Sequence, residues 1–337
     1  MKLKSASVVL SFVSVFILSG FLFFYYQKQE SLKAELAGAL QARAQNVAHN
    51  IDLFLHKKIE VVKDFSSSNT ILKQLYQSNQ EFAGLGKKER NSQIDHLNAY
   101  WIATTDESDP FIKSYMNNAV AQYLKKVAAN NPDEFGEIFV TNRYGSIIAT
   151  TNKLTTLAHA NKYWWKAAYD DGKGRVFLDD RGFDQSVKGY VIGIVMPIKK
   201  GDEIIGIVKA NFNVLGGLSK VLWSDQVDEN AKVMLARSAG LVILEKGKTP
   251  LSSLIPAKVL ANMKPLITES REVSYIELDS ASKKRCAVAY FPVQISLGSE
   301  AVGFGGAYRS ADHYKGNEGE TWLVLVMHDL NDGVVNK

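Results

Sequence analysis

The chain has 337 residues, of which 46% are hydrophobic and 22% are charged. This composition excludes an intrinsically disordered chain, because the apolar surface is large enough to offset the entropy lost on folding. The net charge of +5 is small and evenly spread, which argues against a nucleic-acid-binding protein. The single cysteine, Cys286, excludes an intramolecular disulfide framework and a cysteine-based zinc site.

The N-terminal region contains an uncharged apolar run, residues 6–26. A helix of this length spans the hydrocarbon core of a bilayer, and Tyr25 and Tyr26 suit the membrane interface. A cleaved signal peptide is the alternative, but the run is longer than usual and no small-x-small cleavage site follows it. We expect residues 1–5 to form a cytoplasmic tip and residues 6–26 to anchor the chain in the inner (cell) membrane.

A long helix is predicted after the anchor, over residues 27–69. Apolar residues recur there mostly at three- and four-residue steps, as on one face of a helix. They are Leu32, Leu36, Leu40, Ala44, Val47, Ile51, Phe54, Ile59, Val62 and Phe65. The stripe fits a dimerising, signal-carrying helix or a helix packed on its own domain, and both can hold on different faces.

The rest of the chain predicts two antiparallel α/β modules in tandem. Residues 70–214 begin with a helical stretch, 70–131, and continue with strands joined by short turns, which favour antiparallel pairing. A connecting helix is expected within residues 215–225, and a second module over residues 226–332. Residues 333–337 would start a return to the membrane. The predicted class is α+β.

The second module is predicted from further apolar runs. Strands are expected at residues 232–237, 241–245, 272–278, 285–293 and 321–327, with a helix at 255–263. The glycine-rich run 303–306 is interpreted as a flexible loop near the membrane.

Catalytic and metal-binding signatures are not found in the sequence. The six histidines form no HExxH-like pair, and no nucleophile stands beside a base in a known motif. We therefore expect no catalytic residues, no metal, no cofactor and no enzymatic activity.

The stretches 162–198 (KYWWKAAYDDGKGRVFLDDRGFDQSVKGYVIGIVMPI) and 201–214 (GDEIIGIVKANFNV) resemble the distal module of a double Cache (dCache_1, PAS-like) sensor domain. The aromatic pair, the acidic stretch after the next strand and the apolar-Pro strand before a Gly turn carry the resemblance. The apolar run, long helix and second module match the same architecture over nearly the whole chain.

The resemblance implies an extracytoplasmic (periplasmic or extracellular), homodimeric sensor that binds a small molecule in its distal module. Such sensors belong to bacterial chemoreceptors, histidine kinases of two-component systems, or diguanylate cyclases. In the amino-acid-binding subset, Lys162 would stand at an Arg position, Leu157 at a Tyr position, and Asn211 at the Asp that holds the ligand ammonium. These departures argue against recognition of an α-amino acid.

The candidate ligand-binding residues lie on the strands and loops of the distal module. Strand alternation places Lys209 and Asn211 on one face. Lys209 would bind a small carboxylate, or would pair with Asp179, Asp180 or Asp184. The full set of candidates is Trp164, Trp165, Asp180, Arg181, Asp184, Tyr190, Lys209 and Asn211.

The roles within this set are partly open. Trp164 and Trp165 cannot both point inward from one short helix start, so one is expected in the core and the other in the pocket wall. Tyr190, Asp180 and Arg181 are expected at the rim, and Asp184 as a loop cap or a ligand contact.

The sequence thus favours the sensing module of a transmembrane signal transducer. The alternatives are a stand-alone membrane-anchored binding or scaffold protein and, with less support, a membrane-anchored enzyme. A sensor half that fills all 337 residues suggests a fragment of a longer receptor.

Overall fold

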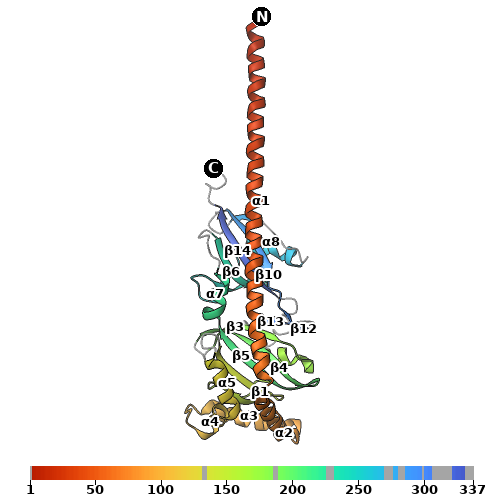
Figure 1. Cartoon of the computed structure of the whole chain (residues 1–337), viewed down its shortest axis with the longest axis vertical. Helices are drawn as coiled ribbons and strands as arrows, with labels where there is room; N and C mark the ends of the chain where they lie inside the picture. Colours follow the sequence, from red (N-terminus) through yellow and green to blue (C-terminus); the bar gives the residue numbers. More distant parts are fainter. Residues whose placement is uncertain are drawn as a thin grey trace.

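The computed structural model describes residues 2–130, 135–184, 189–224, 231–268, 276–279, 285–297, 300–305 and 321–330. Only the backbone is described for residues 2–16, 181, 264–268, 276–279, 285, 296–297 and 300–301. A long N-terminal helix is followed by two antiparallel sheet regions that lie one after the other along it (Figure 1). This confirms the predicted α+β class and the predicted order of its parts.

Helix α1 (Lys2–Ser66) contacts strands of both sheets. Its sequence has no proline, and the side chains that it buries recur at three- and four-residue steps, which place them on one face. They are Leu40, Ala44, Val47, Ala48, Ile51, Leu55, Ile59, Val62 and Phe65. The predicted stripe therefore packs on the chain's own sheets from Leu40 onward, whereas Leu32 is exposed. Pairing of α1 with a second copy stays a prediction.

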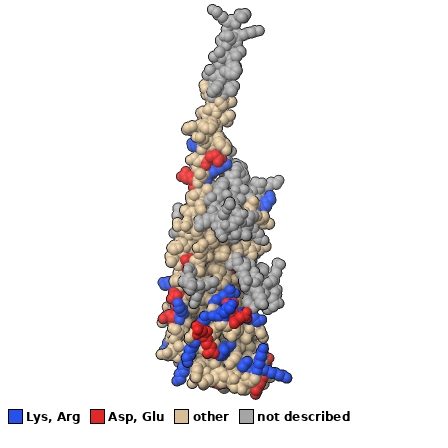
Figure 2. Space-filling view, turned by 90° about the vertical axis from the view of Figure 1, so that its right-hand side faces the viewer, with Lys and Arg blue, Asp and Glu red and all other residues tan. Residues whose placement is uncertain are grey.

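Within the described part of the chain, no helix is both long enough and apolar enough to cross a membrane. The predicted span, residues 6–26, lies partly outside the residues whose side chains are described, which begin at residue 17. Residues 17–27 carry no charge, and Figure 2 shows this uncharged stretch of α1 above the charged residues that follow.

Four short helices form the end of the molecule farthest from the N-terminus (Figure 1). They are α2 (Asn69–Ala83), α3 (Lys87–Ala103), α4 (Pro110–Met116) and α5 (Ala119–Ala129). Three have side-chain N-caps, at Ser68, Asp109 and Asn118, whose oxygens accept from backbone N–H groups of the first turn. The predicted helical stretch 70–131 is confirmed by these four helices.

The first sheet has the strand order β13-β3-β4-β5-β1-β2. Its strands are β1 (Phe135–Asn142), β2 (Ile147–Thr150), β3 (Phe177–Asp184), β4 (Gly189–Lys200), β5 (Glu203–Asn213) and β13 (Gly303–Gly305). The predicted hairpin is β1–β2, in which Asn142 Oδ1 accepts from the N–H groups of Tyr144 and Ser146. Gly145 has a φ of +81°, which only glycine adopts without strain.

Short helices connect and cover this sheet. Helix α6 (Tyr163–Tyr169) and the short turn η1 (Asp170–Gly172) precede β3. The predicted connecting helix is formed by a π-helical turn, η2 (Val214–Leu218), and helix α7 (Ser219–Leu222).

The second sheet has the order β8-β7-β6-β14-β10-β9. Its strands are β6 (Ala231–Arg237), β7 (Leu241–Glu245), β8 (Ser253–Leu254), β9 (Ile276–Asp279), β10 (Arg285–Pro292) and β14 (Trp322–Leu330). Helix α8 (Ala257–Thr268) packs on it, and β11 (Ser296–Leu297) pairs with β12 (Glu300–Ala301). Of the predicted strand 272–278, residues 272–275 lie outside the described part.

The interpretation of residues 303–306 as a flexible loop was wrong for residues 303–305. They form β13, which pairs in parallel with β3 of the first sheet. The loop was predicted because a three-residue strand with two glycines has no strand signal of its own. Its partner lies more than a hundred residues earlier in the chain.

Candidate functional site

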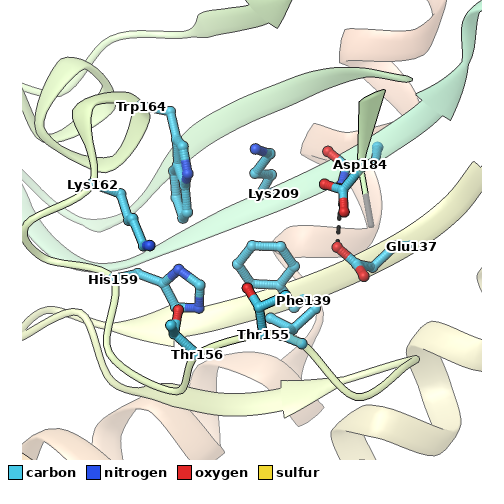
Figure 3. A pocket seen from close by; sticks show the side chains of 11 residues that line it. Glu137, Phe139, Thr155, Thr156, His159, Lys162, Trp164, Asp184 and Lys209 are labelled. Atoms are coloured by element: carbon cyan, nitrogen blue, oxygen red, sulfur yellow. Dashed lines mark hydrogen bonds between the residues drawn. The ribbon is translucent and has the colours of Figure 1, made fainter. Parts of the chain in front are cut away.

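The candidate site is a cavity in the distal module, between the sheet and the segment that leads into α6 (Figure 3). One face of this sheet packs against α1, and the other carries an aromatic-rich cluster that includes α6. The cavity measures about 40 Å³, which is room for about three water molecules. Its lining consists of Glu137, Phe139, Leu154, Thr155, Thr156, His159, Lys162, Trp164, Asp184, Lys209 and Asn211.

Strand β5 places two of the predicted residues in this cavity. Lys209 and Asn211 lie two positions apart, so both point to the same face, as the alternation predicted. They are 2% and 1% exposed. Gly193 on β4 lies opposite Asn211, and a Cβ there would come within 2.6 Å of Lys209 Cε. The glycine at this position therefore leaves room for the Lys209 side chain to extend over β4 toward β3.

The charge of Lys209 is met by a residue of the chain itself. Its ammonium forms a buried ion pair with Asp179, which also accepts a hydrogen bond from the Tyr163 hydroxyl. The ammonium lies 4.6 Å from the ring centroid of Trp164. Of the alternatives for Lys209, the structure therefore has pairing with Asp179, and the ion pair removes the reason to assign Lys209 to a ligand carboxylate.

Asn211 joins two carboxylates at the other end of the cavity. Its Nδ2 donates to Glu137 Oε1 at 3.1 Å and to Asp184 Oδ2 at 3.4 Å. Glu137 and Asp184 are 2% and 4% exposed. These two acceptors fix which way the amide points, and its Oδ1 then has no hydrogen-bond donor among the described residues.

Aromatic rings form the wall beside these polar groups. Phe139 lies 5.7 Å from Trp164, and the His159 ring lies 5.2 Å from Phe139 and 5.3 Å from Trp164, all between centroids. Trp165 lies outside the cavity lining: its indole N–H donates to Thr141 Oγ1 and its ring stacks on Tyr169. As predicted, one tryptophan forms the wall and the other packs in the core.

Asp180 and Tyr190 were expected at the rim, and the structure places both elsewhere. Asp180 follows Asp179 on β3, so it points to the opposite face, where it accepts from Arg237 and from the Trp322 indole. Burial raises the pKa of the Asp180 carboxyl, and the Arg237 charge opposes that rise. Tyr190 is half-buried and packs edge-on against Phe183. The side chain of Arg181 lies outside the described part of the structure.

Of the predicted site residues, the structure brings together Trp164, Asp184, Lys209 and Asn211 in the cavity lining. The sequence prediction missed most of the remaining lining residues. Glu137 and Phe139 could have been found, because they alternate on β1 and face the same side. The wall formed by Leu154, Thr155, Thr156 and His159 lies on an irregular segment, whose direction no periodicity reveals. Within the described residues, no group of three or more His, Cys, Asp or Glu is arranged to hold a metal ion.

Comparison with known proteins finds likeness at the level of structure. No family model matches the chain. No curated protein matches it either. Among solved structures it is similar to the ligand-binding domain of the Pseudomonas fluorescens chemoreceptor CtaA in complex with L-isoleucine. The TM-score is 0.52 at 12% identity, over 92% of this chain and 98% of that one.

The same domain in complex with L-leucine gives a TM-score of 0.51 at 12% identity, over 91% of this chain and 100% of that one. Its complex with L-serine gives 0.52 at 14% identity, over 88% and 98%. At such identities the likeness is one of fold. The chain has the fold of the ligand-binding domains of bacterial chemoreceptors, which confirms at that level its resemblance to double Cache sensor domains.

Proposed function

We propose that the chain is the extracytoplasmic sensing module of a bacterial transmembrane signal transducer of the chemoreceptor, histidine kinase or diguanylate cyclase type. Its ligand is a small molecule bound in the distal cavity. The proposal is supported by the shared fold and by a cavity whose lining includes five buried polar residues, Glu137, His159, Asp184, Lys209 and Asn211. Burying this many polar groups costs stability, so a binding role accounts for their presence better than packing does.

The chemical class of the ligand is inferred from the end of the cavity that is rich in hydrogen-bond acceptors. Asn211 Oδ1 needs a donor, and the Nδ2 of the same amide is bound to the carboxylates of Glu137 and Asp184. A positively charged donor suits this environment, because a bond from an ammonium to a carboxylate or amide oxygen is charge-assisted. We therefore propose a ligand with a small ammonium group, in place of the carboxylate suggested by Lys209 alone.

A carboxylate on the same ligand is the second candidate, and Lys162 supports it. Lys162 lies just before α6 and its side chain lines the same cavity, across from Asp184 (Figure 3). A zwitterion could place its ammonium near Asn211 and its carboxylate near Lys162. The size of the cavity limits either ligand to a few heavy atoms unless the wall moves.

Residues 6–26 are proposed to anchor the module in the membrane. The described part of this segment leaves its large apolar side chains exposed, which favours contact with lipid over contact with the chain's own sheets. They are Ile17, Leu18, Phe21, Leu22, Phe23, Phe24, Tyr25 and Tyr26. Residues 27–69 would then carry the signal and pair with a second copy.

The ligand class is tested by thermal unfolding of the full chain in detergent, with methylammonium, glycine and acetate as probes. A ligand at about 100 times its Kd stabilises the folded state by about 2.7 kcal/mol. We expect methylammonium and glycine to raise the melting temperature and acetate to leave it unchanged. A rise with acetate alone would contradict the proposed ammonium site.

Two leucine variants of the same strand give a matched control. Asn211→Leu removes the acceptor that lines the cavity, so the response to methylammonium should disappear. Asn213→Leu changes an exposed amide, whose Oδ1 accepts from the N–H groups of Leu215 and Gly216. Its response to methylammonium should match that of the wild-type chain.

A further inference from the structure

Two consecutive residues of β3 connect the distal cavity to the proximal module, residues 226–332. Neighbouring side chains on a strand point to opposite faces, so Asp179 and Asp180 face different parts of the molecule. Both are fully buried, with 1% and 0% of their surface exposed. The backbone between them belongs to β3, which lies between β13 and β4 in the distal sheet.

Asp179 faces the cavity side. It holds Lys209 by an ion pair and accepts from the Tyr163 hydroxyl of α6. Lys209 in turn lies over the Trp164 ring, and both line the cavity. A ligand that touches Trp164 or Lys209 therefore acts on the group to which Asp179 is bound.

Asp180 faces the proximal module. Its two carboxylate oxygens accept from Nε and from a second guanidinium nitrogen of Arg237 on β6, a bidentate ion pair. Its Oδ2 also accepts from the Trp322 indole N–H on β14 at 2.9 Å. Trp322 and Arg237 are directly opposite each other in the β6–β14 pair, so one carboxylate is bound to two strands of the second sheet.

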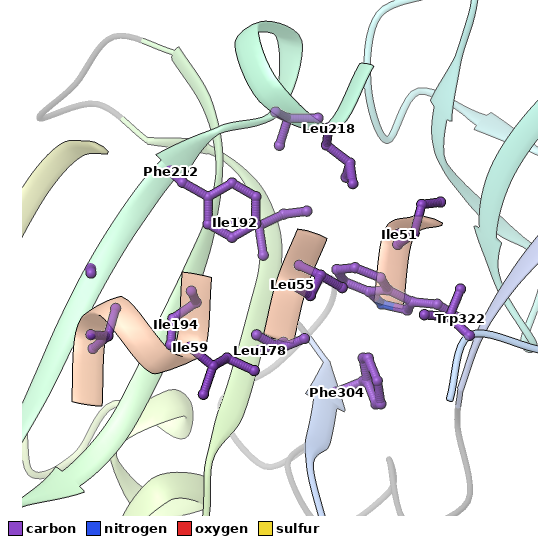
Figure 4. Packing of buried hydrophobic residues seen from close by; sticks show 14 of the residues in the cluster. Ile51, Leu55, Ile59, Leu178, Ile192, Ile194, Phe212, Leu218, Phe304 and Trp322 are labelled. Atoms are coloured by element: carbon purple, nitrogen blue, oxygen red, sulfur yellow. The ribbon is translucent and has the colours of Figure 1, made fainter. Parts of the chain in front are cut away.

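A third contact joins the modules at the same place. Strand β13, from the C-terminal part of the chain, pairs with β3, and Gly305 lies opposite Asp179. The ring of Phe304 on β13 lies 5.2 Å from that of Trp322. Figure 4 shows Phe304 and Trp322 together beside α1, with Leu178 of β3 close by.

We propose that Asp179 and Asp180 form the link through which occupancy of the distal cavity changes the proximal module. The inference rests on the proposed function, because it assumes that the cavity binds a ligand. A shift of Lys209 moves Asp179, and the rigid backbone of β3 moves Asp180 with it. The bidentate bond to Arg237 and the bond to Trp322 then pass the displacement to β6 and β14. Buried, close-packed contacts pass on such a shift, because there is no free space to absorb it.

The test uses the five tryptophans of the chain, replaced by 5-fluorotryptophan and followed by ¹⁹F NMR of the full chain in detergent. The resonance of Trp164 reports on the cavity and that of Trp322 on the link. Each is assigned by its Trp→Phe variant. The first arm needs no ligand: Lys209→Met removes the charge that holds Asp179.

We expect Lys209→Met to move the Trp322 resonance by more than its line width. Lys162→Met is the matched control, because it makes the same chemical change in the same cavity at a residue outside β3 and β5. It should leave the Trp322 resonance in place. An unchanged Trp322 resonance in Lys209→Met would overturn the link. If circular dichroism shows that Lys209→Met does not fold, Asp179→Asn is measured in its place, because it replaces only one carboxylate oxygen by an amide nitrogen. The same two outcomes then apply.

The second arm adds methylammonium to the wild-type chain and to Asp180→Asn. The link predicts that Trp164 and Trp322 both respond in the wild-type chain, and that only Trp164 responds in Asp180→Asn. A wild-type response at Trp164 without one at Trp322 would overturn the link and leave the proposed function standing. No response at Trp164 to methylammonium would contradict the proposed ammonium site, while the first arm still decides the link.

Discussion

The two modules share one strand order and differ in what covers the face away from α1. In the distal module that order is β3-β4-β5-β1-β2, and in the proximal module it is β9-β10-β14-β6-β7. The distal face carries Lys209, Asn211 and Glu137 beneath α6 and the segment before it. The proximal face carries an apolar cluster beneath α8.

The difference lies in the residues of corresponding strands. Strand β5 presents Lys209 and Asn211 to its cavity, whereas β14 presents Leu323 and Leu325 to the cluster under α8. The remaining buried members of that cluster are Met234, Ala236, Val242, Ile255, Val259, Met263, Cys286, Val288 and Tyr290. One fold thus holds a polar cavity or a packed core, depending on a few inward-facing positions.

Breaking the buried ion pair should give the largest effect. Lys209→Met leaves the Asp179 side chain buried without its counter-charge, which costs about 3–5 kcal/mol. The double variant Lys209→Met/Asp179→Leu gives the distal face the apolar character of the proximal one and should recover most of that loss. Urea unfolding measures both. A double variant that is no more stable than Lys209→Met would show that the pair is not the reason for the loss.

Truncating the proximal core comes next. Met263 on α8 is fully buried in the apolar cluster, and Met263→Ala should lower the free energy of unfolding by about 2–5 kcal/mol. The ligand response of the distal cavity should be retained, because the cluster under α8 does not line that cavity. Loss of the methylammonium response in a folded Met263→Ala chain would contradict this division of roles.

The two tryptophans of α6 sharpen the comparison within the distal module. Trp165→Phe removes the hydrogen bond to Thr141 and should cost about 1 kcal/mol of stability without altering the ligand response. Trp164→Leu should weaken the ligand response, because the ring forms the cavity wall over Lys209. Equal ligand responses in the two variants would count against the cavity as the binding site.

The smallest effect is expected where α1 passes the proximal module. Burial raises the pKa of Asp52, while His49 and His56 on the same helix oppose the rise. The cavity beside it is lined by Gln45, Asn46, Ala48, His49, Asp52, Phe291, Pro292 and Gln294.

Because the folded state then binds a proton more readily than the unfolded state, stability falls as the pH rises above about 4. Asp52→Asn should therefore raise the melting temperature slightly at pH 7 and lose that advantage near pH 4. A variant whose advantage does not depend on pH would contradict the assignment.

Much of this arrangement could be predicted from the sequence, and the misses have physical causes. Period-two alternation placed Lys209 and Asn211 on the correct face, and the three- and four-residue spacing found the buried stripe of α1. The partner of Lys209 could not be chosen among Asp179, Asp180 and Asp184. The β3–β4 pairing is irregular between Asp179 and Gly182, so counting residues along the strand does not give the face of those beyond it.

Contacts between distant parts of the chain were beyond prediction. Asp180 was expected at the rim because it stands in the loop-like sequence DDRG, but it is bound to Arg237, which is 57 residues later. Strand β13 pairs with a strand whose sequence gives no sign of it. Such contacts depend on how two modules pack together, and local patterns carry no information about that.

Helix α1 has a consequence for cooperativity. Its buried face belongs to a single apolar cluster that includes strands of both sheets, so neither module has a separate core on that side. Two architectural modules should then unfold in one transition, since detaching α1 from either sheet exposes the core of both. A ligand bound in the distal cavity would therefore also protect amides of the proximal sheet from hydrogen exchange.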